Sequence, residues 1–322
     1  MSLMFEEAPD ISDILERLND DDAEVRCVAV MDLREIDEQE AIPLAINAIK
    51  DPDPGVRVEA AQLMDEYTGA DIAKALVGAL SDTDEAVRAA AATTLAENKN
   101  DEAGEVFLNA IENDDPFVKA SSLRAIRALR LPEVQGAALE SLKHNDASVR
   151  REAVGVLAYL KNDDVLIALM NSARKDSDET VRKVAMGSLV FSKNEKAIET
   201  LIDGLKDQNW QVREESAFVI GKVGQTLAVN ALIDAMSDEY WQVRVKVARS
   251  LGSIKDPAAV DVLGQALSYN ISNLRKEAAA ALGEICSADA LPFLNAAKED
   301  VDPDVRKIVQ WAIDQINSAN SE

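Results

Sequence analysis

The sequence predicts an all-α protein, a right-handed α-solenoid of about ten helix pairs. Three observations lead to this fold class. A Val-Arg pair or a close substitute recurs along the 322 residues at intervals of 31, with one interval of 32. Apolar residues follow each basic residue at the spacing of one helix face, and a second helical pattern precedes it. The basic positions are Arg26, Arg57, Arg88, Lys119, Arg150, Arg182, Arg213, Arg244, Arg275 and Arg306.

The basic residue lies in the second helix of each pair. Three positions after it stands a small or β-branched residue, and seven positions after it an apolar residue, so one helix face is apolar. In seven repeats an Asp four positions earlier is placed to cap the helix and to complement its dipole. We expect the basic side chain to bridge to an Asp of the neighbouring repeat. The predicted caps are Asp22, Asp53, Asp84, Asp115, Asp146, Asp178 and Asp302.

The first helix of each pair is predicted from the stretch upstream, such as "IAKALVGAL" from Ile72 and "AIETLIDGL" from Ala197. Each repeat is therefore two antiparallel helices. We expect a single array over residues 11–316, an N-terminal extension over 1–10 and a C-terminal tail over 317–322. Residues 1–3 precede a second Met and have the form of a cloning remnant.

Composition limits the function classes. The net charge of −25 argues against general affinity for nucleic acid, which needs a basic footprint. Apolar runs fall short of the roughly 20 residues of a membrane span, and the acidic start has no signal-peptide pattern. The two cysteines, Cys27 and Cys286, are too few for a disulfide framework. We therefore expect a cytoplasmic protein that does not enter a membrane.

Two phrases carry a family resemblance: "DPDPGVRVEAAQLM" and "GKVGQTLAVNALIDAMSDEYWQVRVKVARSLGSIKDPAAVDVLGQAL". They resemble HEAT-like repeats of the phycobilin lyase type, and the resemblance extends from about residue 11 to 316. It implies the α-solenoid. Such repeats occur in phycobilin lyase subunits, deoxyhypusine hydroxylase, alkylpurine DNA glycosylases and scaffolds that hold other proteins, so the resemblance leaves the function open.

The reactive side chains then narrow the choice. A single histidine, His144, excludes the His-Glu pairs of a di-iron hydroxylase, most zinc sites and a Ser-His-Asp triad. The acidic runs "NDDDAE" and "SDTDEA" lack the ligand spacing of a calcium loop. We predict no catalytic residue, metal or cofactor. The predicted function is a non-catalytic protein-binding scaffold, adaptor or maturation factor; the alternative is a subunit of a phycobilin-lyase-like enzyme that attaches a tetrapyrrole.

Charge is unevenly distributed along the chain. Residues 1–116 hold 30 acidic and 8 basic side chains, a net of −22, whereas residues 117–322 hold 29 and 26, a net of −3. Self-repulsion of this size works against a compact state. We therefore predict a protein partner whose basic surface faces the acidic N-terminal repeats.

A basic stripe interrupts the acidic chain. Arg124, Arg127 and Arg130 are spaced by three along one side of a second helix, and Arg151 lies in the corresponding helix of the next repeat. Second helices line the concave surface of such arrays. The stripe either binds carboxylates or phosphates of a partner, or offsets acidic neighbours on a solvated face.

Two tryptophans recur in one register. Trp210 and Trp241 open second helices, three residues before Arg213 and Arg244, and Tyr240 replaces the acidic cap before Trp241. The rings either pack at the boundary between repeats or form an exposed aromatic ridge for a partner. We expect both tryptophans to be partly buried and stacked in register.

Overall fold

The computed structural model describes residues 10–97, 101–160, 162–192 and 194–319 of the chain. Contacts divide it into two compact units, residues 1–160 and 161–322. The α-helices of the first unit are α1 (Ile11–Arg17), α2 (Ala23–Asp32), α3 (Glu38–Ala48), α4 (Pro54–Leu63), α5 (Ala70–Ala79), α6 (Glu85–Glu97), α7 (Gly104–Ile111), α8 (Pro116–Ile126), α9 (Gln135–Ser141) and α10 (Ala147–Leu157).

The second unit contains α11 (Asp163–Lys175), α12 (Glu179–Ser188), α13 (Glu195–Gly204), α14 (Trp210–Val223), α15 (Val229–Ala235), α16 (Trp241–Ile254), α17 (Val260–Ala266), α18 (Ser272–Ile285), α19 (Leu291–Ala296) and α20 (Pro303–Ala319). Among the residues described there is no strand, and short 3₁₀ turns supply the remaining regular structure. The all-helical prediction of about ten pairs is confirmed.

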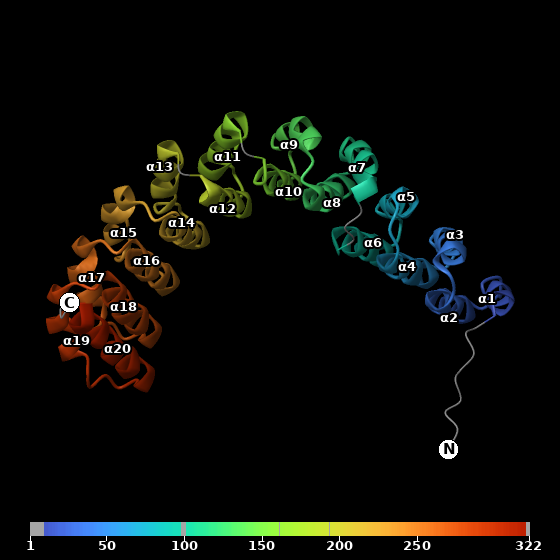
Figure 1. The fold of residues 1–322 in the computed structure, drawn as a ribbon. Helices are drawn as coiled ribbons and strands as arrows, with labels where there is room; N and C mark the ends of the chain where they lie inside the picture. The colour runs from blue at the N-terminus through green and yellow to red at the C-terminus, as the bar shows by residue number, and fades with distance from the viewer. Residues whose placement is uncertain (1–9, 98–100, 161, 193, 320–322) are drawn as a thin grey trace, which may run out of the picture. The chain divides into compact units, whose positions relative to one another are not determined.

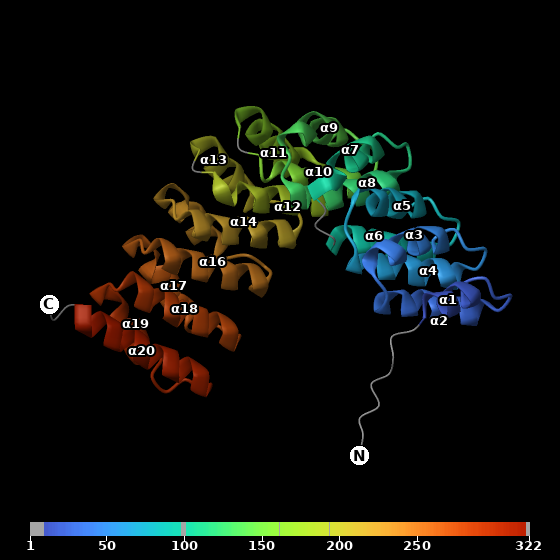
Figure 2. The ribbon, with the colours of Figure 1, turned by 45° about the vertical axis from the view of Figure 1, so that its right-hand side comes forward.

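Each unit is built in two layers. Odd-numbered helices are the first members of their pairs and even-numbered helices the second (Figure 1). In the first unit α2, α4, α6, α8 and α10 pack successively side by side, and in the second unit α12, α14, α16, α18 and α20 do the same. Figure 2 shows the same succession from another side. Consecutive repeats therefore share one core that runs between the layers.

The predicted apolar face is the core. The residue three positions after the basic position is fully buried in all ten repeats, from Ala29 to Val309. The residue seven positions after it is buried as well. Burial of these side chains supplies the hydrophobic stabilisation of each helix pair. The second set is Leu33, Met64, Leu95, Ile126, Leu157, Leu189, Ile220, Leu251, Leu282 and Ile313.

The predicted caps are confirmed. Each Asp accepts a hydrogen bond from a backbone N–H in the first turn of its second helix, as Asp53 does from Gly55 at 2.8 Å. Asn209 caps α14 in the same way, whereas Tyr240 and Ile271 make no capping bond. The helices α16 and α18 therefore begin without a side-chain cap.

The described helices begin at Ile11 and end at Ala319. Asp10, assigned to the N-terminal extension, accepts from the N–H of Ser12 and caps α1. The last helix runs past residue 316 to Ala319. Residues 1–9 of the extension, which include the predicted cloning remnant 1–3, and residues 320–322 of the tail lie outside the described residues.

An arginine ladder joins successive repeats. In five cases the basic residue donates two hydrogen bonds to an Asp 25 residues further along, with closest N–O distances from 2.6 to 2.8 Å. The acceptor is not the capping Asp named above but the Asp two residues before the cap. The pairs are Arg26–Asp51, Arg57–Asp82, Arg182–Asp207, Arg213–Asp238 and Arg275–Asp300.

The ladder is interrupted where the acceptor is not an Asp. Asn113 stands in the position that faces Arg88, His144 in the one that faces Lys119, and Tyr269 in the one that faces Arg244. The Tyr269 ring lies 4.8 Å from the Arg244 Cζ, and the buried Nε of Arg244 has no hydrogen-bond partner in the described part of the chain. At these positions the joint between repeats lacks its charge-assisted hydrogen bonds.

Candidate partner-binding surfaces

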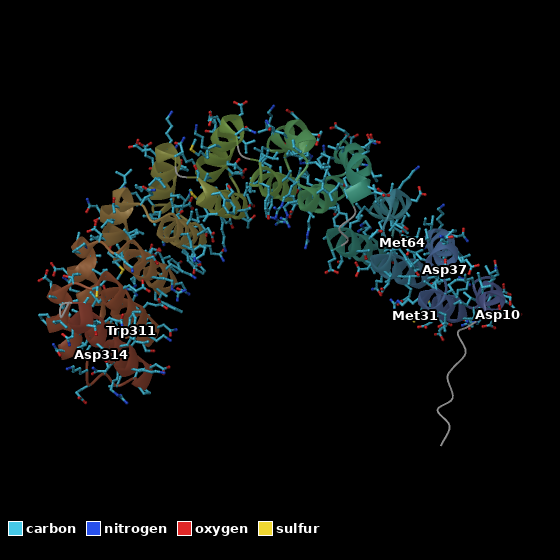
Figure 3. The ribbon with its side chains drawn as sticks, viewed as in Figure 1. Asp10, Met31, Asp37, Met64, Trp311 and Asp314 are labelled. Carbon is cyan, nitrogen blue, oxygen red and sulfur yellow. The ribbon has the colours of Figure 1, made fainter. Side chains whose placement is uncertain are left out.

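The four predicted arginines lie together on α8 and α10 of the first unit. We call them the arginine patch: Arg124 on α8, Arg127 and Arg130 at the end of that helix, and Arg151 on α10. Nitrogen-tipped side chains gather on the side of α8 and α10 that faces away from α7 and α9 (Figure 3). The patch residues come from two successive second helices and the 3₁₀ turn that follows the first of them.

One carboxylate serves two of these arginines. The Arg127 Nη1 lies 3.6 Å from Glu152 Oε2, and the Arg151 Nη2 lies 3.1 Å from Oε1 of the same residue. The Arg127 side chain passes so close to Gly155 that a Cβ there would lie 3.0 Å from Nη1. Arg130 stacks on the Tyr159 ring, with Cζ 4.8 Å from the centroid. Arg124 is exposed and makes no ion pair or hydrogen bond within the described residues.

The aromatic residues lie in the second unit, at the first turns of α14 and α16. We call Trp210, Tyr240 and Trp241 the aromatic ridge. Trp210 stacks on Tyr240, with ring centroids 5.6 Å apart and planes inclined by 13°. Tyr240 also covers Arg213, whose Cζ lies 5.5 Å from the ring centroid. The ring contact thus joins two successive repeats.

The expectation for Trp241 is wrong in one respect. The residue is 38% exposed and so partly buried, as expected, but among the described residues its ring has no stacked partner. The partner of Trp210 is the Tyr in the cap position of the next repeat, and the corresponding residue for Trp241 is Ile271, which is not aromatic. Packing of the two tryptophans therefore differs although their local sequence is the same.

Sequence reasoning missed a groove in the first unit. It lies between α3 and α5, has a volume of about 1030 Å³, and is lined by apolar side chains that include Ile42, Ile46 and Ala75. Pro43 and Gly78 also line the groove, and a Cβ added to Gly78 would meet no atom within 4 Å. Helical periodicity marks all these residues as one face, but the distance between neighbouring first helices is a tertiary property.

The described residues offer little redox or metal chemistry. No group of three or more His, Cys, Asp or Glu side chains in the described part of the chain could hold a metal ion. Burial raises the pKa of the Cys27 thiol above its usual value, and nearby carboxylates act in the same direction. A raised pKa lowers the thiolate fraction at neutral pH, and with it the nucleophilicity of Cys27. Over the described ranges, no helix has the length and apolar character needed to span a membrane.

Comparison with solved structures gives the same fold. Kap95p, solved in a complex with RanGDP, matches 95% of this chain with 49% of its own, at a TM-score of 0.64 and 14% identity. YibA of Escherichia coli covers 93% of this chain with 99% of its own length, at a TM-score of 0.53 and 18% sequence identity. An engineered protein covers 96% of this chain with 99% of its own length, at a TM-score of 0.51 and 20% sequence identity. The chain thus spans about half the length of Kap95p.

No curated protein matches the sequence. The family model for HEAT repeats, in contrast, matches residues 11–82, 72–145, 136–221, 198–270 and 229–314, which together span nearly the whole array. Two-layer helix pairs, a repeated buried face and a repeated arginine agree with that match. The chain belongs to the HEAT repeat family.

Proposed function

We propose that this protein is a non-catalytic scaffold or adaptor that binds a partner protein on the aromatic ridge. One observation carries the proposal: Tyr240 and Trp241 are 39% and 38% exposed side by side at the start of α16, where most other repeats have an acidic cap. Tyr, Trp and Arg are the residues most enriched at interface hot spots.

The ridge is also prepared for binding. Stacking on Trp210 and the contact with Arg213 hold the Tyr240 ring in one orientation. Arg213 is in turn held by Asp238, with an N–O distance of 2.6 Å. A side chain that is already ordered loses less conformational entropy when a partner covers it. This support favours a binding role over a purely structural one.

Similar solenoids supply an analogy. Kap95p is described in complex with RanGDP, and Kap121p with the extreme C-terminus of the protein phosphatase Cdc14p. Both resemble this chain in fold alone, at 14% and 13% identity. They support protein binding as the function class and carry no information about the partner.

The ridge proposal predicts loss of partner capture without loss of fold. Trp241→Ala and Tyr240→Ala should each lower the free energy of unfolding by about 1 to 2 kcal/mol and leave the unit folded, because the residues are 38% and 39% exposed and lose only part of a packing surface. The amount of partner protein that copurifies from the native cells, quantified by mass spectrometry, should fall about tenfold. Leu227→Ala is the control, since Leu227 is a 57% exposed side chain of the same unit outside the ridge. Undiminished capture by both folded ridge variants would refute the proposal.

We also propose that the partner presents a basic surface to the acidic repeats of residues 1–116. Their net charge of −22 would steer such a partner by long-range attraction. The association rate with the identified partner should fall steeply between 0.01 M and 0.15 M salt, as the Debye length shortens from about 30 Å to about 8 Å. A rate independent of salt would contradict this part of the proposal.

The second candidate, a subunit that attaches a tetrapyrrole, is favoured by the groove between α3 and α5. Its volume of about 1030 Å³ lies at the upper end of small-molecule sites. Among the described residues, neither Cys nor His lines the groove, so these residues offer a pigment space but no thiol or imidazole. An absorbance spectrum of protein purified from its own cells decides between the candidates: a visible band that survives gel filtration favours the tetrapyrrole.

The cellular setting belongs to the same proposal. Cys27 and Cys286 are both free thiols. Because thiols persist in reducing compartments, we propose that the scaffold acts in the cytoplasm.

A further inference from the structure

We propose that the arginine patch of the first unit receives an oxyanion carried by a peptide segment of the partner, either a phosphorylated side chain or a run of carboxylates. This inference deepens the proposed protein-binding function and rests on it. It concerns a different unit from the aromatic ridge. The patch therefore makes an independent prediction about the chemistry of the partner.

The first step is the local charge. Of the four guanidinium groups of the patch, two pair with a carboxylate, and it is the same one: Glu152, which lies within ion-pair distance of Arg127 and Arg151. Arg124 has no partner in the described residues, and Arg130 rests on an uncharged ring. An excess of guanidinium groups over carboxylates repels itself, and an added anion relieves that repulsion. The solvated-face interpretation requires more acidic neighbours than the patch contains.

The second step is the geometry that holds the guanidinium groups. Glu152 contacts Arg127 and Arg151 from one side, and Gly155 leaves room for Arg127 to lie on α10. Tyr159, in the turn that follows α10, supports Arg130. Planar guanidinium groups held in this way offer paired N–H donors that match phosphate and carboxylate oxygens.

The third step is a backbone conformation that disfavours arginine. Arg130 has φ 52°, in the left-handed region, where the helix end at Gly224 has glycine with φ 71°. A side chain costs free energy there because its Cβ crowds the following carbonyl. The same register of later repeats holds Lys255 at φ 62° and Cys286 at φ 61°, so the fold accepts side chains at this position. Because glycine costs the least free energy there, replacing Arg130 with glycine removes the guanidinium group without straining the backbone.

The fourth step selects the ligand class. Arg127 and Arg151 have side chains about 40% exposed and Arg124 and Arg130 are exposed, so the patch is open and does not enclose a small molecule. Nucleic acid needs a continuous basic track, whereas residues 1–116 of the same unit carry a net charge of −22. A single oxyanion on a peptide satisfies the patch without bringing a polyanion against those acidic repeats.

The test uses the full chain and fluorescein-labelled peptides of one glycine-serine sequence, bearing a phosphoserine, three successive glutamates or no charge. Fluorescence anisotropy should show about tenfold tighter binding of a charged peptide than of the neutral one. The better of the two charged peptides identifies the source of the oxyanion. Equal binding of all three peptides would overturn the inference. Tighter binding of a fluorescein-labelled oligonucleotide than of either charged peptide would also overturn it.

Three variants locate the site. Arg124→Glu with Arg127→Glu should remove the preference for the charged peptide. Arg130→Gly should weaken binding severalfold while the melting temperature stays equal or rises, an outcome that a purely structural Arg130 would not produce. The control, Arg174→Glu with Lys175→Glu, makes the same charge change on α11 and should bind normally. Normal binding by Arg130→Gly and by the folded double variant would overturn the inference, whereas lost partner capture in the ridge variants bears only on the proposed function.

Discussion

Asp207→Asn should destabilise the second unit by about 2 kcal/mol in free energy of unfolding. Asp207 accepts two hydrogen bonds of 2.8 Å from Arg182 of the preceding repeat, and both side chains are about nine-tenths buried. The amide keeps the shape and the acceptor for the N–H of Asn209 but leaves Arg182 partly buried without its counter-ion. Urea unfolding followed by circular dichroism measures the loss.

Asp203→Asn is the matched control. Asp203 also pairs with an arginine 29 residues away, at 2.9 Å from Arg174, but its side chain is 61% exposed. Exposed ion pairs contribute about 0.2 to 1 kcal/mol because water and salt screen them. Equal effects of the two substitutions would mean that the ladder acts as an ordinary surface ion pair.

The effect of Asp207→Asn should depend on pH. Burial opposes ionisation of Asp207, but hydrogen bonds from Arg182 and the Asn209 N–H outweigh it, so the pKa is held below its usual value. A carboxyl with a lowered folded-state pKa stabilises the protein above its unfolded pKa of about 3.9, and that stabilisation is lost as the pH falls through the folded-state pKa. The difference between the variant and the unaltered protein should be constant near pH 7 and shrink below about pH 4.

The reciprocal substitution should repair an interrupted step. Asn113→Asp restores the acceptor that faces Arg88, where the Asn113 side chain already accepts from the Asp115 N–H. We expect a gain of about 1 kcal/mol, or a rise of roughly 2 to 4 °C in melting temperature. A loss of stability would show that added negative charge on this acidic unit outweighs the local pair.

Gly252→Ala should destabilise the second unit by about 1 to 3 kcal/mol through overpacking. A Cβ on Gly252 would lie 2.7 Å from the Ala281 Cα, and backbone cannot move aside as a side chain can. The same contact recurs at Gly221 and Gly283, whose added Cβ atoms would lie 2.8 and 2.9 Å from the Cα atoms of Ser250 and Ala312. Trp311, on the last helix of this unit (Figure 3), also lies against Gly283.

Gly78→Ala is the matched control for helix propensity. Gly78 lies in α5 with nothing within 4 Å of an added Cβ, so alanine there should stabilise by about 0.5 to 1 kcal/mol. Thermal unfolding of both variants separates close packing from propensity. A stabilised Gly252→Ala would mean that α16 and α18 separate at little cost.

Local sequence was sufficient for the repeat, the pairs and the buried face. The residues from Leu33 to Ile313 that recur seven positions after the arginine are all buried, because a helix places such positions on one side whatever its neighbours are. The caps from Asp22 to Asp302 were equally readable, since an N-cap bond joins residues two or three apart. The 25-residue offset of the ladder was readable too, once the Asp that stands two positions before most of the caps is aligned with the arginine of the preceding repeat.

Contacts between repeats required the tertiary structure. Trp210 and Trp241 have the same local sequence, yet one stacks on Tyr240 and the other is exposed, because a ring's burial depends on the residue that the next repeat places beside it. The close approach at Gly252 and the groove at Gly78 likewise depend on the spacing between helices. Sequence by itself therefore determined the HEAT repeat fold and the position of its arginines. Only the tertiary structure decided which arginines share a carboxylate and which aromatic rings reach solvent, because those outcomes are set by distances between helices and not by periodicity along one.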